Sequence, residues 1–306
     1  MCRRRLFVPG SSLTDADCRS GDAVDHSDAV DHSDAVGHSL FDLLSAALRS
    51  EAPVALAEVV EGPDGLIAGK LLLRPGSDPD TSGTLGDADL DRVVARDARG
   101  ELAAGLTVTR HYGHHGEARG RDVSVFIESF APPPRMVIFG AVDFTAALAK
   151  VAKILGYRVT VCDARPVFAT RARFPMADDL VVDWPDRHLR AVGAGLGQRD
   201  VVCVLTHDPK FDVPAIVAAL KTKVGYLGAM GSRRTHRERM ARLVDAGVTE
   251  AELERVMGPI GLDIGARTPE ETAVSIMAEI IAVRTGREAP SLRDREGPIH
   301  LDAGAG

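Results

Sequence analysis

Apolar runs of strand length alternate with helix-length segments through the second half of the chain. The predicted strands cover 136–140, 158–163, 179–183, 200–206 and 223–228, and the predicted helices cover 144–155, 186–196, 212–221, a segment ending near Asp245, and 269–285. Strands that are apolar on both faces and separated by helices are typical of a parallel sheet covered on both sides. The pattern therefore predicts an α/β domain with a doubly wound parallel sheet over residues 135–290.

The segment before this domain has a different pattern. Apolar residues recur at helical spacing from Ser39 until Pro53 ends the run, and a charged, helix-like stretch follows at 87–99. Short strand-like runs lie at 54–60, 70–74, 106–110 and 123–130. These elements predict a small α+β domain over 38–131. The three prolines after Ala131 cannot continue a strand ladder and mark the boundary.

The first 37 residues contain the hexapeptide Ala-Val-Asp-His-Ser-Asp twice, followed by Ala-Val-Gly-His. Such a repeat has too little apolar surface to offset its ordering entropy, so 1–37 is predicted to be a disordered extension. Its spaced histidines leave weak metal binding open as an alternative. Residues 291–306 are predicted to form a flexible tail.

The composition excludes several classes of function. The chain has 45% hydrophobic and 26% charged residues and a formal net charge of -7. This charge argues against wholesale binding of nucleic acid or an anionic membrane. No apolar stretch approaches the roughly 18 residues of a membrane span, and no signal-peptide pattern follows the first methionine. The four cysteines have no metal or disulfide spacing, and reduced thiols fit the predicted cytoplasmic location.

In a doubly wound sheet, ligands bind at the carboxyl ends of the strands, close to helix N-termini. The first such loop contains Gly140 and Asp143, but Val142 stands where the second glycine of a dinucleotide fingerprint belongs. The second loop contains Asp163, about 20 residues after Gly140, followed by Arg165. In dinucleotide-binding domains an acidic residue at this place accepts a hydrogen bond from a ribose hydroxyl. A helix or turn cap is the alternative role of Asp163.

Two further loops carry polar side chains. A strand ends at Thr206, His207 and Asp208, which are interpreted as contacts to a ligand or partner. The alternative is that Asp208 caps the following helix.

The loop at 225–235 is the most informative of the four. Glycines free its backbone, a serine is a natural N-cap, and arginines supply phosphate-matching donors. Its candidate residues for anion binding are Gly228, Gly231, Ser232, Arg233 and Arg234. A solvated helix face is the alternative.

A glycine-rich connection then leads to a strong helix-start signal. Thr268 is the expected cap, with Pro269 at the first helical position and acidic residues in the first turn. Asp263 and Arg267 precede it and are predicted to lie near the edge of the sheet.

Residues 135–290 resemble the C-terminal domain of the XdhC/CoxI family of xanthine dehydrogenase and carbon monoxide dehydrogenase accessory proteins. The resemblance is carried by the passages at 159–175, 204–212, 226–243 and 258–280. It implies a Rossmann-like fold and a chaperone that binds the molybdenum cofactor, either as molybdopterin or in a dinucleotide form. It further implies sulfuration with a cysteine desulfurase and delivery to a molybdenum hydroxylase apoenzyme. A homodimer is the expected assembly, and the metal is expected to be held through the cofactor.

The chain departs from the family in its first domain. Where the family has a Gly-Gly-Cys-Val-Glu-like segment, residues 83–89 contain no cysteine. A thiol ligand from this segment is therefore not expected here.

Two other functional classes stay open. An NAD(P)-dependent oxidoreductase fits the fold and Asp163, although no tyrosine is followed four residues later by lysine; a pure interaction scaffold is the third class. No catalytic residue is assigned, so the expected role is a maturation factor rather than an enzyme. The histidines at 111, 114 and 115 suggest a metal site, but the flanking glycines favour a turn.

Overall fold

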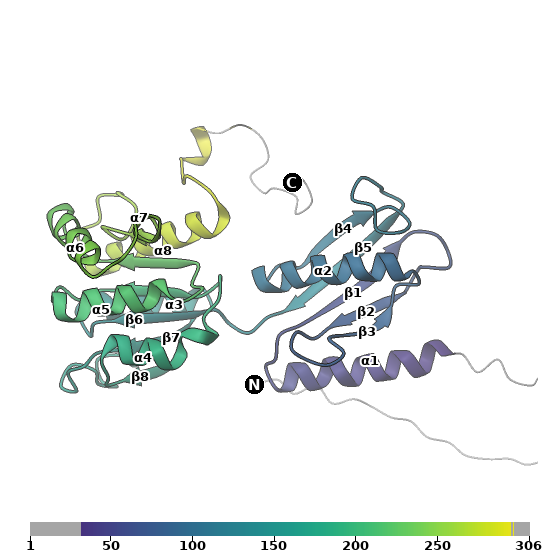
Figure 1. Cartoon of the computed structure of the whole chain (residues 1–306), viewed down its shortest axis with the longest axis horizontal. Coiled ribbons are helices and arrows are strands. Elements are labelled where there is room, and N and C mark those ends of the chain that lie inside the picture. Colours follow the sequence, from purple (N-terminus) through teal and green to yellow (C-terminus); the bar gives the residue numbers. More distant parts are fainter. Residues whose placement is uncertain (1–31, 295, 297–306) are drawn as a thin grey trace, which may run out of the picture.

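The computed structural model describes residues 32–294 and residue 296, which form a five-stranded and a six-stranded sheet (Figure 1). The predicted extension therefore falls largely outside the described residues. The first helix begins at His32, before the predicted domain start at residue 38. Once a helix has formed, each added residue gains a hydrogen bond, so it can extend past its apolar segment. Within the described residues, no helix is long and apolar enough to cross a membrane.

The five-stranded sheet is antiparallel, with strand order β3-β2-β1-β5-β4. Its elements are α1 (His32–Arg49), β1 (Val54–Glu61), β2 (Lys70–Leu73), β3 (Thr81–Thr84), α2 (Ala88–Ala104), β4 (Val108–Tyr112) and β5 (Val123–Phe130). Residues in β1 alternate between the two faces, as a strand requires. Ala55 and Ala57 belong to the core under α2, whereas Val54 packs with Leu40 of α1.

The six-stranded sheet is parallel throughout, with strand order β11-β10-β9-β6-β7-β8. Its strands are β6 (Arg135–Phe139), β7 (Arg158–Cys162), β8 (Asp179–Val181), β9 (Val201–Val204), β10 (Tyr226–Ala229) and β11 (Val256–Met257). Its helices are α3 (Asp143–Ile154), α4 (Pro185–Val192), α5 (Pro209–Leu220), α6 (Arg233–Asp245), α7 (Glu250–Leu253) and α8 (Pro269–Thr285). The predicted α/β class and parallel sheet are confirmed.

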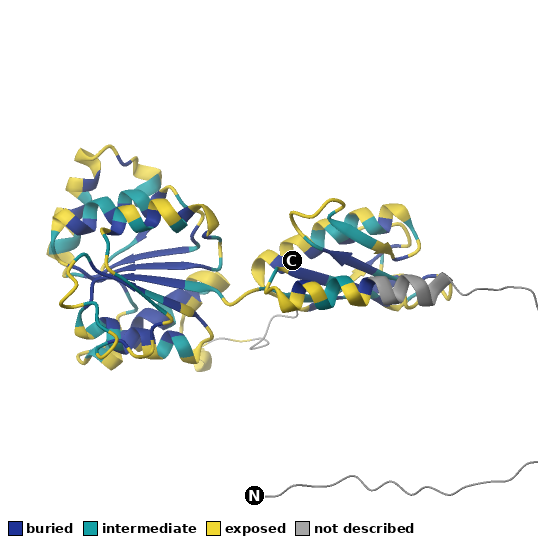
Figure 2. Cartoon of the chain, turned by 90° about the horizontal axis from the view of Figure 1, so that it is seen from below, coloured by how far each residue is buried: buried dark blue, intermediate teal, exposed yellow. Residues whose placement is uncertain are grey.

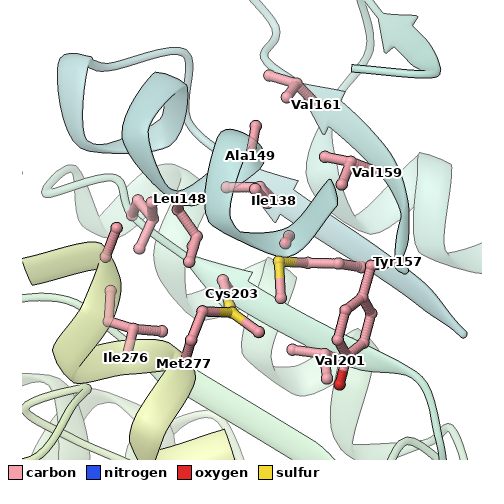
Figure 3. Close-up of a cluster of buried hydrophobic side chains, with 14 of the residues drawn as sticks. Ile138, Leu148, Ala149, Tyr157, Val159, Val161, Val201, Cys203, Ile276 and Met277 are labelled. Carbon is pink, nitrogen blue, oxygen red and sulfur yellow. The ribbon is translucent and has the colours of Figure 1, made fainter. Parts of the chain in front are cut away.

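Helices cover both faces of this sheet, and the strands between them are buried (Figure 2). Met136 and Ile138 point to the face covered by α3 and α8, while Val137 and Phe139 point to the face covered by α4, α5 and α6. Figure 3 shows the first core, in which Leu148, Ile276 and Met277 close over the strands. The predicted domain boundary after Ala131 stays a prediction, although the core residues of the two sheets fall on either side of it.

Candidate functional site

The strand order locates the place where a ligand would bind. From β6 the chain first adds β7 and β8 on one side, and then returns to add β9, β10 and β11 on the other. In order of appearance the strands read 3-2-1-4-5-6 from β8 to β11, which is the Rossmann order. The crossovers diverge between β6 and β9. The loops that follow these two strands therefore flank the switch point, where such sheets bind ligands.

The loop after β6, which begins at Gly140, is packed tightly against the loop after β9, which begins at Leu205. Gly140 has a φ of 109°, and a Cβ at this position would lie 2.8 Å from Thr206 Cγ2 and 3.1 Å from the Thr206 amide nitrogen. The hydroxyl of Thr145 donates a hydrogen bond to the Gly140 carbonyl. Glycine is therefore required at residue 140 by backbone conformation and by space. Asp143 instead points outward, its side chain 88% exposed, and pairs with Arg173 at 3.2 Å.

Asp163 is buried and already saturated with hydrogen bonds. Its oxygens accept from the Ala141 amide at 2.8 Å, the Arg165 amide at 2.9 Å, and Arg165 Nε and Nη2 at 2.9 and 2.8 Å. A carboxylate offers about four acceptor positions, so these four donors fill them. The ribose hydroxyl expected at Asp163 would have to displace one of them. Asp163 instead fixes the first loop and clamps the Arg165 guanidinium.

Ionised Asp163 also makes stability depend on pH. Burial opposes its ionisation, but hydrogen bonds from Arg165 and the Ala141 amide outweigh burial and hold the pKa of Asp163 below its ordinary value. The unfolded pKa is about 3.9. Because the folded pKa is the lower one, the contribution to stability is present above the unfolded pKa and is lost as the pH falls through the folded pKa.

Asp163→Asn is expected to lower the free energy of unfolding at neutral pH by about 1–3 kcal/mol, because buried donors lose a charged acceptor. The deficit relative to wild type should shrink as the pH falls below about 4, where the unfolded carboxyl becomes protonated, and should be lost once folded Asp163, whose pKa is lower, is protonated as well. Urea unfolding from pH 7 down to the lowest pH at which both proteins stay folded measures this. A deficit that stays constant over that range would contradict the assignment.

A buried ion pair between Asp212 of α5 and Arg239 of α6 is hydrogen-bonded to the loops after β9 and β10. The Thr206 hydroxyl donates to the Asp212 carboxylate, and Arg239 Nη2 donates to Asp212 at 2.9 Å and to the Met230 carbonyl at 2.7 Å. Arg239 and Asp212 are 2% and 3% exposed. The predicted ligand contact Thr206 therefore points its hydroxyl inward. Sequence reasoning missed Asp212 and Arg239, although Arg239 precedes the buried Leu243 by four residues and so shares its helix face.

The other two predicted residues of the loop after β9 have different roles: Asp208 caps a helix, and His207 is exposed. Asp208 is the N-cap of α5: its carboxylate accepts from the Lys210 amide at 3.1 Å and pairs with Lys210 Nζ at 3.1 Å. The cap alternative for Asp208 is thus present in the structure. His207 is exposed beside it.

The start of α6 keeps part of the predicted anion site. Ser232 is its N-cap and accepts from the Thr235 amide at 3.1 Å, but within the described chain the amides of Arg233 and Arg234 have no hydrogen-bond partner. The guanidiniums of these arginines are largely exposed and pair with Asp263 at 3.5 Å and Glu238 at 3.0 Å. The amides are thus available to an anion, while the guanidiniums would have to exchange partners.

The other predicted residues near α6 differ in position. Gly231 has a φ of 149° and lies at the turn into α6. Gly228 lies inside β10, where a Cβ would be 2.4 Å from Ile260 Cδ1, so its role is packing rather than ligand contact. The ion pair from Asp263 to Arg233 brings the later glycine-rich loop beside α6. Arg267 is exposed at the end of this loop, and its amide donates to Glu271 at 2.7 Å.

A shallow pocket lies away from this site, at the amino end of β10. Its lining includes Val224, Tyr226, Arg255 and Met257. The Arg255 guanidinium there donates to the carbonyls of Leu220 and Thr222 at 2.7 and 3.1 Å. Because these donors close the end of α5, the pocket is not a second candidate for an anionic ligand.

The histidine cluster and the cysteines give no metal site in the described part of the chain. No group of three His, Cys, Asp or Glu side chains there is arranged to hold a metal ion. His115 Nδ1 instead lies 2.7 Å from the carboxylate of Asp87, the N-cap of α2, in the segment that lacks the family cysteine. Cys162 is buried, and desolvation raises the pKa of its thiol to about 12, so it is a poor thiolate ligand.

The fold and the site thus define a Rossmann-type domain with a glycine turn at its switch point and unpaired amides at the start of α6. Residues 136–280 match the family described as the XdhC Rossmann domain. The predicted family resemblance is confirmed.

Two curated relatives are similar over part of their length. A Bacillus subtilis protein, named as a probable component of xanthine dehydrogenase, is 31% identical in an alignment of 195 residues, and the match covers 58% of this chain and 56% of the relative. The molybdenum cofactor insertion chaperone PaoD of Escherichia coli is 28% identical over 172 residues, covering 56% of this chain and 47% of PaoD. The chain thus matches about half the length of these relatives.

Among solved structures, a crystal structure of a xanthine dehydrogenase from Bacillus halodurans is similar at 20% identity. The similarity covers 82% of this chain and 97% of that one, with a TM-score of 0.46.

Proposed function

We propose that this chain is an accessory protein that binds the molybdenum cofactor, as molybdopterin or in a dinucleotide form, and assists its insertion into a molybdenum hydroxylase apoenzyme. The proposal includes sulfuration of the cofactor with a cysteine desulfurase, a recipient of the xanthine dehydrogenase or carbon monoxide dehydrogenase type, and a homodimeric chaperone. It is supported by the similarity to a relative named as an insertion chaperone, and by the match of residues 136–280, which contain the switch-point loops, to the XdhC Rossmann domain.

The observation that carries the proposal is the pair of free amides at the start of α6. Unpaired amides and the helix dipole favour an anion such as the phosphate of a pterin cofactor. A second observation supports the same place. Arg239 lies beneath the turn, since a Cβ on Gly231 would be 3.6 Å from Arg239 Nη2, and its Nε and Nη1 are buried without a partner among the described residues. The turn thus combines amide donors with an underlying positive charge.

In this proposal the cofactor supplies the molybdenum centre of the recipient enzyme, and the protein supplies retention and orientation. The amides of Arg233 and Arg234 would bind the phosphate, and their guanidiniums would turn from Asp263 and Glu238 towards it. Charge-assisted hydrogen bonds of this kind contribute about 1.5–3 kcal/mol each. No residue of the chain is asked to perform a chemical step.

The test is to purify the full chain from cells that make molybdenum cofactor and to measure bound pterin by its fluorescence after oxidation. The variant Arg233→Ala/Arg234→Ala is expected to retain about tenfold less pterin, the loss that about 1.4 kcal/mol produces. Its control is Arg237→Ala/Arg242→Ala, which removes two arginines from the same helix away from its start and should retain pterin like the wild type.

Equal retention by the two double variants would contradict the assignment of the α6 start. Consistent absence of pterin, with NAD(P)H bound instead, would favour the oxidoreductase alternative. That alternative draws support from the strand order, but the saturated carboxylate of Asp163 leaves it without the usual ribose acceptor.

A further inference from the structure

Aromatic side chains are scarce in this chain, yet several meet at one edge of the candidate site. The sequence has one Trp, three Tyr and nine Phe in 306 residues. Trp184 lies 5.0 Å from Phe211 between ring centroids. The guanidinium carbon of Arg165 lies 4.4 Å from the centroid of Phe168 and 6.0 Å from that of Phe211. Lys210 Nζ lies 4.8 Å from Phe211. We call these five residues the aromatic face.

The outer members of the aromatic face are open to solvent. Trp184 is 40% and Phe168 38% exposed, and the Arg165 side chain is 45% exposed, whereas Phe211 is buried beneath them. Burying a large apolar side chain is worth about 1.5–3 kcal/mol, so leaving two rings open forgoes stabilisation. Exposed rings and a flat guanidinium on one surface form the kind of platform on which a nucleic acid base stacks.

Asp163 gives this face a fixed orientation. Both Nε and Nη2 of Arg165 are bonded to the buried carboxylate, at 2.9 and 2.8 Å, which holds the guanidinium plane against Phe168. A platform ordered before binding loses little conformational entropy when a ligand arrives. Lys210 lies at the border of the face and pairs with Asp208 at 3.1 Å, so a nucleotide phosphate that reached it would have to exchange places with that carboxylate.

The position of the face relative to α6 constrains the ligand. Phe168 follows β7 and α6 follows β10, and β10, β9, β6 and β7 are successive neighbours in the sheet. Three strand spacings of about 4.8 Å separate them, or about 14 Å. A ligand that places a phosphate at α6 and a ring on the aromatic face therefore needs an extended polar middle. Dinucleotides have ribose and pyrophosphate in that place.

We infer that the aromatic face is a stacking site for the base of a nucleotide. The base lies on the exposed part of the aromatic face that Phe168 and the Arg165 guanidinium form, with Trp184 bordering it on Phe211, and its phosphates extend towards the Gly140 loop. The inference rests on the proposed function for the other end of the ligand, and it selects the dinucleotide form of the cofactor. Because Asp163 has no free acceptor, the ribose hydroxyls are not recognised there.

The only tryptophan of the chain is part of this face, so its intrinsic fluorescence reports on the site without a label. The purified full chain, freed of bound cofactor, is titrated with ADP and with CDP, and with ribose 5-phosphate as a ligand without a base. The nucleotides are expected to quench Trp184 fluorescence with saturation, and ribose 5-phosphate is not. 2′-Deoxy-ADP should bind within about twofold of ADP, a difference far below the roughly tenfold that 1.4 kcal/mol produces.

Phe168→Ala keeps the Trp184 reporter and removes one stacking ring. It is expected to weaken nucleotide binding by about 5- to 150-fold, the range that stacking on one ring contributes. Arg165→Lys keeps the charge but loses the flat guanidinium and should weaken binding as well. The matched control is Phe41→Ala, which removes a 69% exposed ring from α1 and should bind like the wild type. Circular dichroism checks that each variant is folded.

Two outcomes would overturn the inference: no saturable quenching by either nucleotide, or equal affinity of Phe168→Ala and wild type. The cofactor that copurifies with the wild type gives an independent readout after acid hydrolysis. Pterin without an equimolar nucleotide would refute the base site and leave the proposed function standing. Saturable nucleotide binding without any copurified pterin would refute the proposed function and leave the base site standing.

Discussion

Arg239→Met is expected to lower the free energy of unfolding by about 3–5 kcal/mol, because it leaves the buried Asp212 carboxylate without its counter-charge. Arg239 is 2% exposed and donates from one nitrogen to both Asp212 and the Met230 carbonyl. Methionine fills similar space but has no hydrogen-bond donor for the Asp212 carboxylate or for the Met230 carbonyl. Denaturant unfolding of the wild type and the variant measures the difference.

Two further variants separate the buried pair from general effects on the helix. Arg242→Met removes an arginine of the same helix whose pairing with Glu238 is long, at 3.9 Å, and exposed, so it should cost less than about 1 kcal/mol. Arg239→Met/Asp212→Leu removes both charges and should recover much of the loss, as replacement of buried pairs by apolar residues often does. If Arg239→Met costs no more than Arg242→Met, the network does not hold the β9 and β10 loops together.

Gly140→Ala is expected to destabilise the protein by several kcal/mol. Two costs combine there: about 1–3 kcal/mol for a side chain at a backbone conformation that only glycine adopts easily, and about 1–3 kcal/mol for overpacking. The second cost arises because the new methyl group would lie 3.1 Å from the amide nitrogen of Thr206, which is backbone and cannot rotate away. Thermal and denaturant unfolding report the total.

Gly156→Ala is the matched control for this variant. Gly156 also has a positive φ, of 80°, but a Cβ there would have no atom within 4 Å apart from its own chain neighbours. It therefore carries the conformational cost without the collision, and Gly140→Ala should exceed it by about 1–3 kcal/mol. If the two variants lose the same free energy of unfolding, the Gly140 and Thr206 loops can move apart without cost. They would then not be tightly packed at the switch point.

Elements with a complete local signal were predicted well from the sequence. The strand predicted at 123–130 coincides with β5, and the helix predicted at 269–285 coincides with α8. The helix bounds could be predicted because Thr268 and Glu271 form a capping box around Pro269, and such caps act within one turn. Its far end is set by Gly286, which has a φ of 63°.

Elements that depend on a distant partner were missed. β3 has the sequence Thr-Ser-Gly-Thr, which has no apolar alternation, and it exists because Lys70 to Leu73 of β2 pair with it. β11 has only two residues and is defined by pairing with β10. The small α7 beside it was missed as well, since a single helical turn gives no periodic pattern. Ladder bonds between strands cannot be read from the residues of one strand alone.

The loops of the candidate site were predicted, but their internal bonds were not. Strand ends and glycines identify the four loops, because topology fixes where parallel strands finish. Whether Asp163 faces a ligand or Arg165, and whether Thr206 points out or in, depends on neighbours contributed by other parts of the chain. Five arginines lie between 233 and 242, and their number concealed the single buried one.

The outermost strands of the parallel sheet, β8 and β11, have three and two residues. An edge this short exposes few unpaired backbone groups, so another polypeptide gains little by adding a strand to it. In the proposed role, such brevity would keep the protein from joining sheet to sheet with copies of itself or with a recipient enzyme. Recognition of that enzyme would then depend on side chains of loops and helices.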